Sequence, residues 1–272
     1  MSGGSDIALI AGQGALPGLI ARTAPGVLVC EMEGTPSEIG TPDTLRFRIE
    51  RLVPFLDTLA DRGIKQVVFA GALQRPRVDM ELIDPRSAQL VPRLAMAMQA
   101  GDDATLRAVI EIFEDWDFKV VGAHEIVPDL VCASGVICGA PSDRDRADAK
   151  RAAAIVADLG RADIGQGAVV AGGLCLAVET LPGTDAMLEF VRLHKGLRYD
   201  LKAVQGVFYK APKPGQDRRA DLPAIGVQTV HNAAAAGLSG IAFEAGGVML
   251  LDRDAVIEAA KAAGLFLWAC AP

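Results

Sequence analysis

Short apolar runs alternate with amphipathic helical patterns along almost the whole chain, and this alternation restricts the fold more than any other feature. The apolar runs have the length and the bounding glycines of buried strands. Strands that alternate with helices in this way form parallel sheets with helices on their faces. The runs that we interpret as strands are 7–12, 26–32, 65–71, 119–126, 168–180 (a hairpin around Gly172-Gly173), 205–211, 240–246, 248–252 and 265–271.

The segments between these runs carry helical periodicity. Leu106, Val109, Ile110 and Phe113 recur at i, i+3, i+4 and i+7, which predicts an amphipathic helix over 104–114. The other segments that we expect to be helical are 51–63, with Pro54 in its first turn, a helix that begins after Ser142, 185–194, and a last helix around 256–263.

A polar stretch, PSDRDRADAK (141–150), marks the expected domain boundary. A chain of 272 residues agrees with two domains, since one domain takes about 150 residues. The sequence therefore predicts an α/β protein with two α/β domains. Residues 1–141 would form an N-terminal Rossmann-like domain with a parallel sheet, and residues 142–272 a C-terminal mixed α/β domain.

The overall charge and the N-terminus narrow the class of protein. A net charge of −7 argues against nucleic acid or anionic lipid as a whole-surface partner, so any anion site must be local. The five cysteines form no CxxC pair, as expected of reduced thiols. We see no basic signal-peptide region and no run of 18 apolar residues, so the sequence predicts a cytoplasmic protein.

The loop AGQGALPG (11–18) joins a predicted strand to a predicted helix, where glycines let the backbone approach a phosphate. It matches only part of a dinucleotide fingerprint, because Pro17 occupies the third glycine position. Glu31 or Glu33 could bind a ribose. A phosphate or nucleotide contact, a plain strand–helix turn and a true NAD site therefore all stay open.

Other polar groups lie at strand ends and helix starts. ALQRPR (72–77) follows a strand, so Arg75 and Arg77 could meet anions or simply face solvent. GDD (101–103) opens a helix, where its acids could act as caps. The three histidines have no metal-ligand spacing, and neither a GxSxG elbow nor a Walker loop occurs. Asp163, Gln166, Thr184 and Asp185 are, taken singly, ordinary cap and turn residues.

The stretch KAPKPGQDRRADLP (210–223) carries a formal charge of +2, although the whole chain is acidic. Its three prolines restrict the backbone. Four cations, Lys210, Lys213, Arg218 and Arg219, could neutralise phosphate oxygens. Asp217 and Asp221 are hard oxygen ligands of the kind that Mg²⁺ accepts. Cations interleaved with carboxylates favour a metal-assisted site for a phosphorylated substrate, with a solvated surface loop as the alternative.

KPGQDRRADLPAIG (213–226) closely resembles the signature of the LpxI-type UDP-2,3-diacylglucosamine pyrophosphatases of bacterial lipid A biosynthesis. Pro182 stands where that family would have a glutamate, which puts an acidic role there in doubt, although Glu179 could compensate. The likeness covers nearly the full chain, through AGQGALP, FAGALQRPR, AGDDATLR, VVGAHEIVPDL, DIGQGAVV, GTDAML, GLSGIAFEAGG and GLFLWA in that order.

This resemblance implies a magnesium-dependent hydrolase that cleaves UDP-2,3-diacylglucosamine to UMP and 2,3-diacylglucosamine 1-phosphate (lipid X). It implies two α/β domains with the ligand between them, a nucleotide-binding N-terminal one and a catalytic C-terminal one. Water would attack the phosphorus on the sugar-lipid side. We expect Asp221 to hold Mg²⁺ or to orient that water, with Asp217 as the other candidate for both roles. Lys213 and Arg219 would stabilise phosphate charge.

The resemblance also suggests where the substrate binds. The nucleotide is expected near Gly12, Gln13 and Gly14 and near the 72–75 turn. The stretch 90–101, with Met96 and Met98, is either a lining for acyl chains or ordinary core. The substrate-binding candidates are Gly12, Gln13, Gly14, Ala72, Leu73, Arg75, Gln99, His124, Gln166, Thr184, Asp185, Gln216, Glu244 and Gly246.

Two other classes of function stay open at this stage. A sensor of nucleotide sugars or lipids would bind without turnover and without magnesium. A Rossmann-type oxidoreductase would bind NAD(P), which Pro17 disfavours. The resemblance leaves a homodimer and a peripheral contact with the inner membrane as open expectations.

Overall fold

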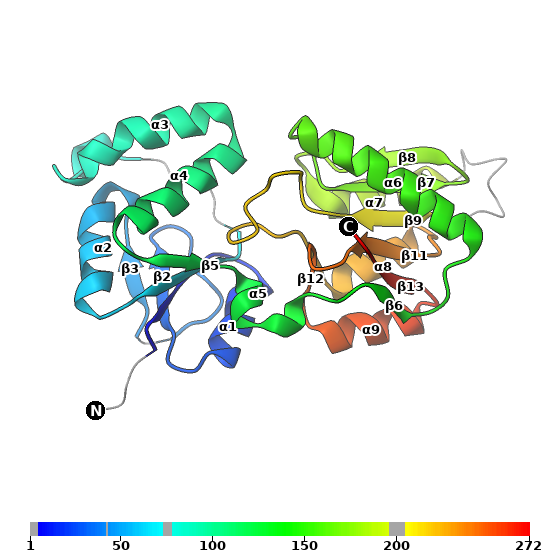
Figure 1. Ribbon diagram of the computed structural model, residues 1–272, viewed down its shortest axis with the longest axis horizontal. Helices are drawn as coiled ribbons and strands as arrows, with labels where there is room; N and C mark the ends of the chain where they lie inside the picture. The colour runs from blue at the N-terminus through cyan, green and yellow to red at the C-terminus, as the bar shows by residue number, and fades with distance from the viewer. Residues whose placement is uncertain (1–4, 42, 73–77, 196–204) are drawn as a thin grey trace. The chain divides into compact units, whose positions relative to one another are not determined.

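The structure is a computed structural model that describes residues 5–41, 43–72, 78–195 and 205–272. Its chain forms two compact units (Figure 1). Unit 1 contains residues 1–128 together with the short segment 217–221, and unit 2 contains residues 129–216 and 222–272. The loop that the sequence singles out is therefore shared between the units.

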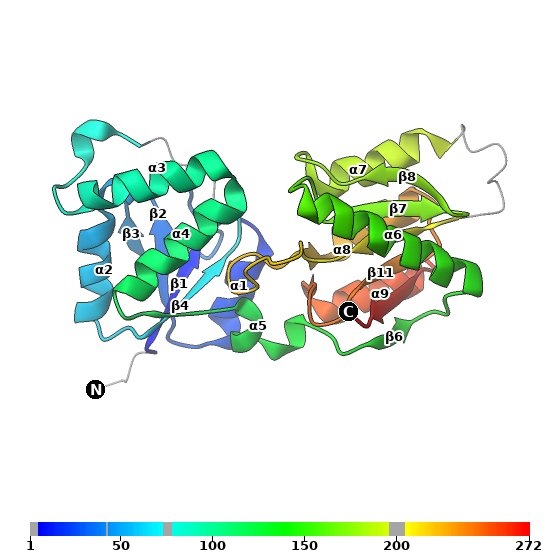
Figure 2. The ribbon, with the colours of Figure 1, turned by 45° about the horizontal axis from the view of Figure 1, so that its top comes forward.

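Unit 1 is built on a five-stranded sheet in the order β3-β2-β1-β4-β5, in which every neighbouring pair is parallel (Figure 2). This order agrees with five positions of a doubly wound nucleotide-binding sheet. The strands are β1 (Ile7–Ala11), β2 (Leu28–Met32), β3 (Leu45–Phe47), β4 (Gln66–Ala70) and β5 (Lys119–Val121).

The helices of unit 1 cover this sheet because their apolar faces pack on the alternating side chains of the strands. Leu56 and Leu59 of α2 and Ile110 and Phe113 of α4 share one buried cluster with Ile10 of β1 and other strand residues. The helices are α1 (Ala15–Thr23), α2 (Leu52–Asp61), α3 (Val91–Ala100), α4 (Asp102–Asp115) and α5 (Ala123–Ile126), with 3-10 turns η1 (Ile49–Arg51), η2 (Met80–Leu82), η3 (Ser87–Leu90) and, after them, η4 (Pro128–Leu130).

Unit 2 is built on a mixed six-stranded sheet in the order β6-β13-β11-β9-β7-β8. Its central pairs are parallel, whereas β6, β7 and β8 run antiparallel to their neighbours. The strands are β6 (Gly135–Cys138), β7 (Gly167–Ala171), β8 (Leu174–Val178), β9 (Val207–Lys210), β11 (Gly240–Glu244) and β13 (Phe266–Cys270), with β10 (Ala224–Ile225) and β12 (Met249–Leu250) forming a separate parallel pair.

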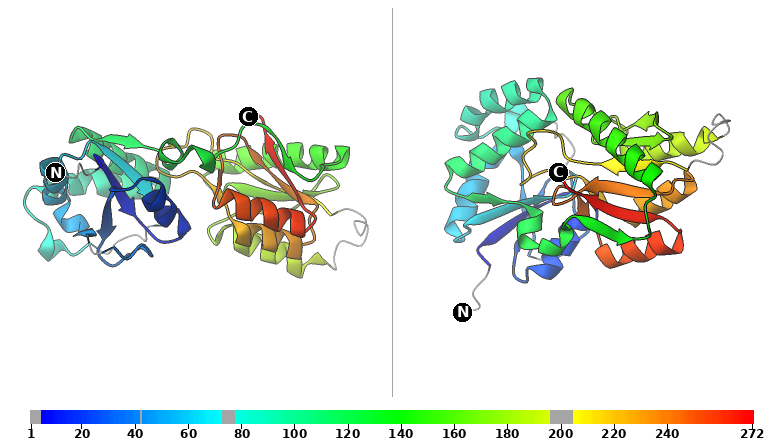
Figure 3. Two further views of the ribbon diagram at one scale, coloured as in Figure 1. Left: turned by 90° about the horizontal axis from the view of Figure 1, so that it is seen from below. Right: turned by 45° about the vertical axis from the view of Figure 1, so that its right-hand side comes forward.

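Helices lie on both faces of the unit 2 sheet, with α6 on one face and α7, α8 and α9 on the other (Figure 3). Strand β9 shows why: Val207 and Tyr209 pack in the cluster with α6, while Phe208 packs in the cluster on the opposite face. The helices are α6 (Asp143–Arg161), α7 (Gly183–Leu193), α8 (Val227–Ala235) and α9 (Arg253–Ala262). The predicted class, two α/β domains with a parallel and a mixed sheet, is confirmed.

Local signals in the sequence explain two of these elements. Ser142 Oγ accepts a hydrogen bond from Asp145 N at 3.2 Å, and Asp145 Oδ2 accepts one from Ser142 N at 2.8 Å, which fixes the start of α6. The hairpin predicted at Gly172-Gly173 is confirmed as β7–β8. Both glycines have positive φ, and the carboxylate of Asp148 accepts hydrogen bonds from both of their N–H groups.

The strand predicted over 119–126 is wrong in its second half. Strand β5 ends at Val121, and α5 follows directly. The helix forms because Gly122 N donates to Glu125 Oε1 at 2.8 Å and Glu125 N donates to the carbonyl of Gly122 at 2.9 Å. Within the described ranges, no helix combines the length and apolar content that crossing a membrane requires.

Candidate functional site

The charged loop begins at the end of β9 and reaches β10, and its middle is fixed by an ion-pair cluster within unit 1. Asp217 accepts hydrogen bonds from Arg219 N at 2.9 Å, from Arg219 Nε at 3.0 Å and from Arg219 Nη2 at 2.7 Å. Arg219 Nη1 also donates to Glu114 Oε1 of α4 at 2.5 Å. Ala220 packs against the apolar core of unit 1. The segment 217–221 is therefore packed and hydrogen-bonded as part of unit 1.

Arg219 affects the titration of Asp217. Its hydrogen bonds hold the pKa of the Asp217 carboxyl below the ordinary value of 3.8. Because the pKa is lowered on folding, this pair stabilises the loop at pH values above 3.8, and the contribution is lost as the pH falls further. Asp217 and Arg219 thus each have a structural role in this segment, and their predicted roles as metal and phosphate ligands stay predictions.

Asp221 lies exposed at the end of the same segment and has an interaction partner of its own. In the described part of the chain, no group of three or more His, Cys, Asp or Glu side chains could hold a metal ion. Mg²⁺ in phosphoryl-transfer sites commonly takes one or two carboxylates and completes its shell with substrate oxygens and water. The residues present fit that kind of site, with Asp221 as the carboxylate, and they do not form an all-protein cage.

Lys213 and Gln216 lie together in unit 2, beside the end of α6. Lys213 Nζ contacts Asp163 Oδ1 at 2.5 Å, and Lys213 N donates to Gln216 Oε1 at 2.8 Å. Gln166 Nε2 donates to the same Gln216 oxygen at 2.8 Å. The Lys213 side chain is 22% exposed and that of Asp163 is 49% exposed. An ion pair that is this exposed contributes little to stability.

Lys210, the last residue of β9, forms the most buried polar contact near the loop. Its Nζ donates to Thr184 Oγ1 at 2.7 Å and lies 3.9 Å from Glu179 Oε2, and the residue is only 7% exposed. Glu179 Oε2 is buried without a hydrogen-bond partner among the described residues. A Cβ at Gly167 would lie 2.6 Å from that oxygen and 2.9 Å from Phe208 Cε2, so glycine leaves room there for both side chains. Glu179 therefore lies close to the lysine that contacts Thr184 of the GTD segment, and a role in place of the acid expected at position 182 stays a prediction.

The end of β11 brings further predicted residues to the same edge of the unit 2 sheet. β9 and β11 are parallel neighbours, with Lys210 in register with Phe243, so Lys210 and Glu244 lie at adjacent carboxyl ends. Ligands of open α/β sheets bind at such ends. Gly246 has φ +67°, and a Cβ at Gly247 would lie 2.5 Å from Glu244 Oε1 and 2.9 Å from Pro212 Cδ. The turn after β11 thus packs closely on the start of the charged loop.

Asp185, by contrast, is used inside unit 2. Its Oδ1 accepts a hydrogen bond from Asn232 Nδ2 of α8 at 2.8 Å. This contact ties the first turn of α7 to α8. Of the GTD segment, Thr184 is therefore the residue that contacts the buried lysine.

The glycine loop of unit 1 crosses the turn after β4. Gln13 N donates to the carbonyl of Ala72 at 2.9 Å, and Ala72 N donates back to Gln13 O at 3.0 Å. Gly12 N donates to Ala70 O, and a Cβ at Gly12 would lie 2.5 Å from the Ala72 oxygen. The N–H groups of Gly12 and Gln13 are therefore already hydrogen-bonded within the protein. A phosphate would instead meet Gly14, which has φ +95°, and the first turn of α1.

The remaining substrate-binding candidates of unit 1 are Gln99, His124, Leu73 and Arg75. Gln99 is exposed on α3. His124 Nδ1 is buried and has no hydrogen-bond partner within the described chain. A Cβ at Gly122 would lie 2.6 Å from that nitrogen and 3.3 Å from the carbonyl oxygen of Arg218, so His124 lies beside the 217–221 segment. Leu73 and Arg75, with Arg77, lie outside the described residues.

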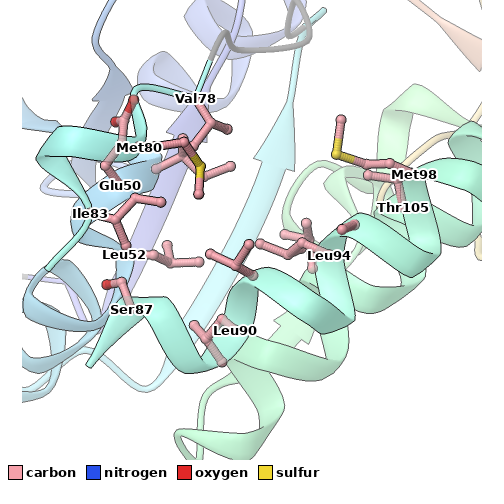
Figure 4. A pocket seen from close by; sticks show the side chains of 14 residues that line it. Glu50, Leu52, Val78, Met80, Ile83, Ser87, Leu90, Leu94, Met98 and Thr105 are labelled. Carbon is pink, nitrogen blue, oxygen red and sulfur yellow. The ribbon is translucent and has the colours of Figure 1, made fainter. Parts of the chain in front are cut away.

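The stretch 90–101 borders an apolar cavity of about 190 Å³ within unit 1 (Figure 4). Met98 of α3 lines this cavity, together with apolar side chains such as Leu52 and Met80. Met96, by contrast, is 73% exposed. A role of this stretch as a lining for acyl chains stays a prediction.

Comparison with known proteins gives matches over both units. A model of the LpxI N-terminal domain matches residues 6–130, and a model of the LpxI C-terminal domain matches residues 133–268. The chain is similar to the UDP-2,3-diacylglucosamine pyrophosphatase LpxI of Caulobacter vibrioides. The two are 39% identical over 284 residues, which covers 96% of each chain.

Proposed function

Because this chain belongs to the LpxI family, we propose that it hydrolyses the pyrophosphate bond of UDP-2,3-diacylglucosamine. The products are UMP and 2,3-diacylglucosamine 1-phosphate. The observation that carries the proposal is the identity of 39% with a pyrophosphatase of that name over 96% of both chains. The charged loop and the polar groups at the carboxyl ends of β9 and β11 supply the residue types that such a substrate needs.

To catalyse this reaction, the site must stabilise the negative charge that develops on the phosphate oxygens. Water attacks phosphorus on the sugar side, the bond from that phosphorus to the bridging oxygen breaks, and the bridging oxygen leaves with UMP. Cations that bind this charge better in the transition state than in the substrate accelerate the reaction. Lys213 suits this role because its ammonium group pairs with the exposed carboxylate of Asp163, and such a pair is weak.

Asp221 is proposed to bind Mg²⁺ or to orient the attacking water. A bound Mg²⁺ would neutralise charge on the pyrophosphate oxygens. Arg219 and Asp217 are proposed to hold the segment that carries Asp221, because Arg219 links it to Glu114 of α4. Contact with a membrane surface and a homodimer stay predictions.

Magnesium dependence gives the first test of the reaction. With UDP-2,3-diacylglucosamine as substrate, we expect release of UMP and lipid X in the presence of Mg²⁺. Excess EDTA should reduce the rate by at least about 100-fold, and added Mg²⁺ should restore it, because the cations of the chain alone leave much of the phosphate charge uncompensated. Tight binding of the substrate without any UMP release would contradict hydrolysis and favour a sensor.

The glycine loop gives a second test, on binding of the nucleotide. Gln13 is exposed, and its backbone groups are already bound to Ala72, so its side chain is the part free to contact a ligand. We expect Gln13→Ala to raise KM for the substrate about threefold to tenfold with kcat nearly unchanged, as for the loss of one hydrogen bond. Steady-state kinetics would show this split. An unaltered KM in both Gln13→Ala and Gly14→Val would place the nucleotide elsewhere.

A further inference from the structure

Helix α6 of unit 2 ends in a Schellman motif whose left-handed position is occupied by an aspartate. Ile164 N donates to the carbonyl of Leu159 at 2.9 Å, and Asp163 N donates to the carbonyl of Gly160 at 3.1 Å. Asp163 itself has φ +54°. Glycine is the residue that usually occupies this position, because it has no Cβ to clash in the left-handed region.

Other helices of this chain follow that preference. Helices α2, α8 and α9 end in the same motif, with Gly63, Gly237 and Gly264 at the position that Asp163 has after α6. An acid is also unfavourable here for a second reason, since the last carbonyl groups of a helix carry partial negative charge. Asp163 thus conflicts with two local preferences. Residues that do so are expected to have a use elsewhere in the molecule.

The contact of Asp163 with Lys213 shows what that use is. Asp163 Oδ1 accepts a hydrogen bond from Lys213 Nζ at 2.5 Å, across 50 positions of the chain. Because the pair is exposed, it adds little to the free energy of unfolding. The stability of the fold therefore does not explain why an aspartate stands at this position.

The backbone of Lys213 is fixed independently of Asp163. Lys213 N donates to Gln216 Oε1 at 2.8 Å, and the carbonyl of Lys213 accepts a hydrogen bond from Gln216 N at 3.1 Å. A Cβ at Gly160 would lie 2.5 Å from Pro214 Cδ and 3.2 Å from Lys213 Cα, so the loop packs directly on the last turn of α6. The backbone leaves only the direction of the long lysine side chain open, and Asp163 holds the far end of that side chain.

A lysine that is held in this way can still bind phosphate. An ammonium group has three N–H donors, of which Asp163 Oδ1 can engage one, and the Lys213 side chain is 22% exposed. Such a lysine loses less rotamer freedom when a substrate binds than an unrestrained one. A cation that is already oriented is also the kind that stabilises charge in a transition state most effectively.

We propose that Asp163 is a positioning residue that directs the ammonium group of Lys213 towards the pyrophosphate of the substrate. The inference rests on the proposed function, because it gives Asp163 a part in the same reaction. Asp163 acts through Lys213 and is not assigned a contact with the reacting atoms.

The test replaces Asp163 by glycine, which fits the left-handed backbone and removes the carboxylate. We expect the midpoint of thermal unfolding to stay unchanged or to rise by up to about 4 °C, because both local conflicts disappear. The kcat for UMP release should nevertheless fall about tenfold, since the released lysine side chain must be ordered in every turnover. KM should change less than about threefold. A purely structural role would not lower kcat in a protein of unchanged stability.

Two further variants show whether the effect passes through Lys213. Asp163→Asn keeps an oxygen acceptor and tolerates the left-handed backbone, so it should retain at least about a third of the wild-type kcat. In a Lys213→Met background, Asp163→Gly should change kcat by less than about twofold. The matched control is Asp117→Gly, which makes the same exchange in the same motif after α4 and should keep wild-type kinetics.

The kinetic results can overturn the inference and leave the reaction in place. Equal kcat values in the wild type, Asp163→Gly and Asp163→Asn would do so while UMP is still released. A tenfold loss that persists in the Lys213→Met background would do so as well, because Asp163 would then act by another route.

A measurement without turnover separates the two proposals from the other side. Acetic anhydride acetylates lysine amines, and mass spectrometry of peptides gives the rate at Lys213. Acetylation about twofold to fivefold faster in Asp163→Gly than in the wild type would show that Asp163 holds the amine, even if UMP release failed. Equal acetylation rates in the two proteins would refute the positioning role.

Discussion

Replacing Asp221 by alanine is expected to lower kcat by at least about 100-fold, or about 2.7 kcal/mol of transition-state stabilisation. The carboxylate is exposed and lies at the end of a segment that Arg219 fixes to Glu114. A fixed carboxylate that binds Mg²⁺ or orients water acts mainly in the transition state, so kcat should fall far more than KM rises. Steady-state kinetics of UMP release would measure both.

The control is Asp61→Ala, at the exposed last residue of α2, which should keep wild-type kinetics. Asp221→Asn then distinguishes the two roles. A higher Mg²⁺ concentration for half-maximal rate would assign Asp221 to the metal, whereas a low kcat at an unchanged Mg²⁺ requirement would assign it to the attacking water. An Asp221→Ala enzyme that keeps more than about a tenth of the wild-type kcat would remove Asp221 from the chemical step.

The second large effect concerns stability. Replacing Lys210 by methionine should lower the free energy of unfolding by about 3 kcal/mol, because it leaves Glu179 buried without its nearby ammonium group. The side chains of Lys210 and Glu179 are only 8% and 13% exposed, so solvent screens the pair weakly. Thr184 Oγ1 also loses its donor. Urea unfolding would measure the change, provided that the slope with denaturant stays constant.

A double-mutant cycle shows how much of this loss comes from the pair itself. Lys210→Met with Glu179→Gln should be more stable than the sum of the single losses predicts, by at least about 1 kcal/mol. The matched control is Lys261→Met, where a 55% exposed lysine pairs with Glu258. That change should stay within about 0.5 kcal/mol. Additive losses at Lys210 and Glu179 would show that the two groups do not interact.

The sequence predicted the architecture well because the architecture depends on local patterns. Apolar runs located the strands, and the glycine pair at 172–173 located a hairpin. The prediction of a strand over 119–126 was wrong from Gly122 onward. There Glu125 caps the backbone and starts a helix in spite of the apolar pattern. Strand β3 was missed because it has three residues, too few for a recognisable period.

The candidate site was less predictable, since its contacts join residues that are far apart in sequence. Arg219 and Glu114 are separated by 105 positions, and no local signal marked Glu114 as the anchor of the loop. The same holds for Lys213 with Asp163, 50 positions apart. The sequence located the cations and carboxylates of the loop, but only the fold shows that Arg219 is held by two acids whereas Lys213 is held by an exposed one.

Unit 1 is discontinuous in sequence, and this has a consequence for synthesis. Its segment 217–221 follows residues 129–216 of unit 2 along the chain, yet it supplies Ala220 to the unit 1 core and Arg219 to Glu114. A ribosome that adds 5–20 residues per second needs roughly 5 to 19 s to proceed from residue 128 to residue 221. During that interval unit 1 lacks the segment 217–221, and Glu114 cannot yet form its ion pair with Arg219. Unit 1 becomes complete only after most of its partner unit has been translated.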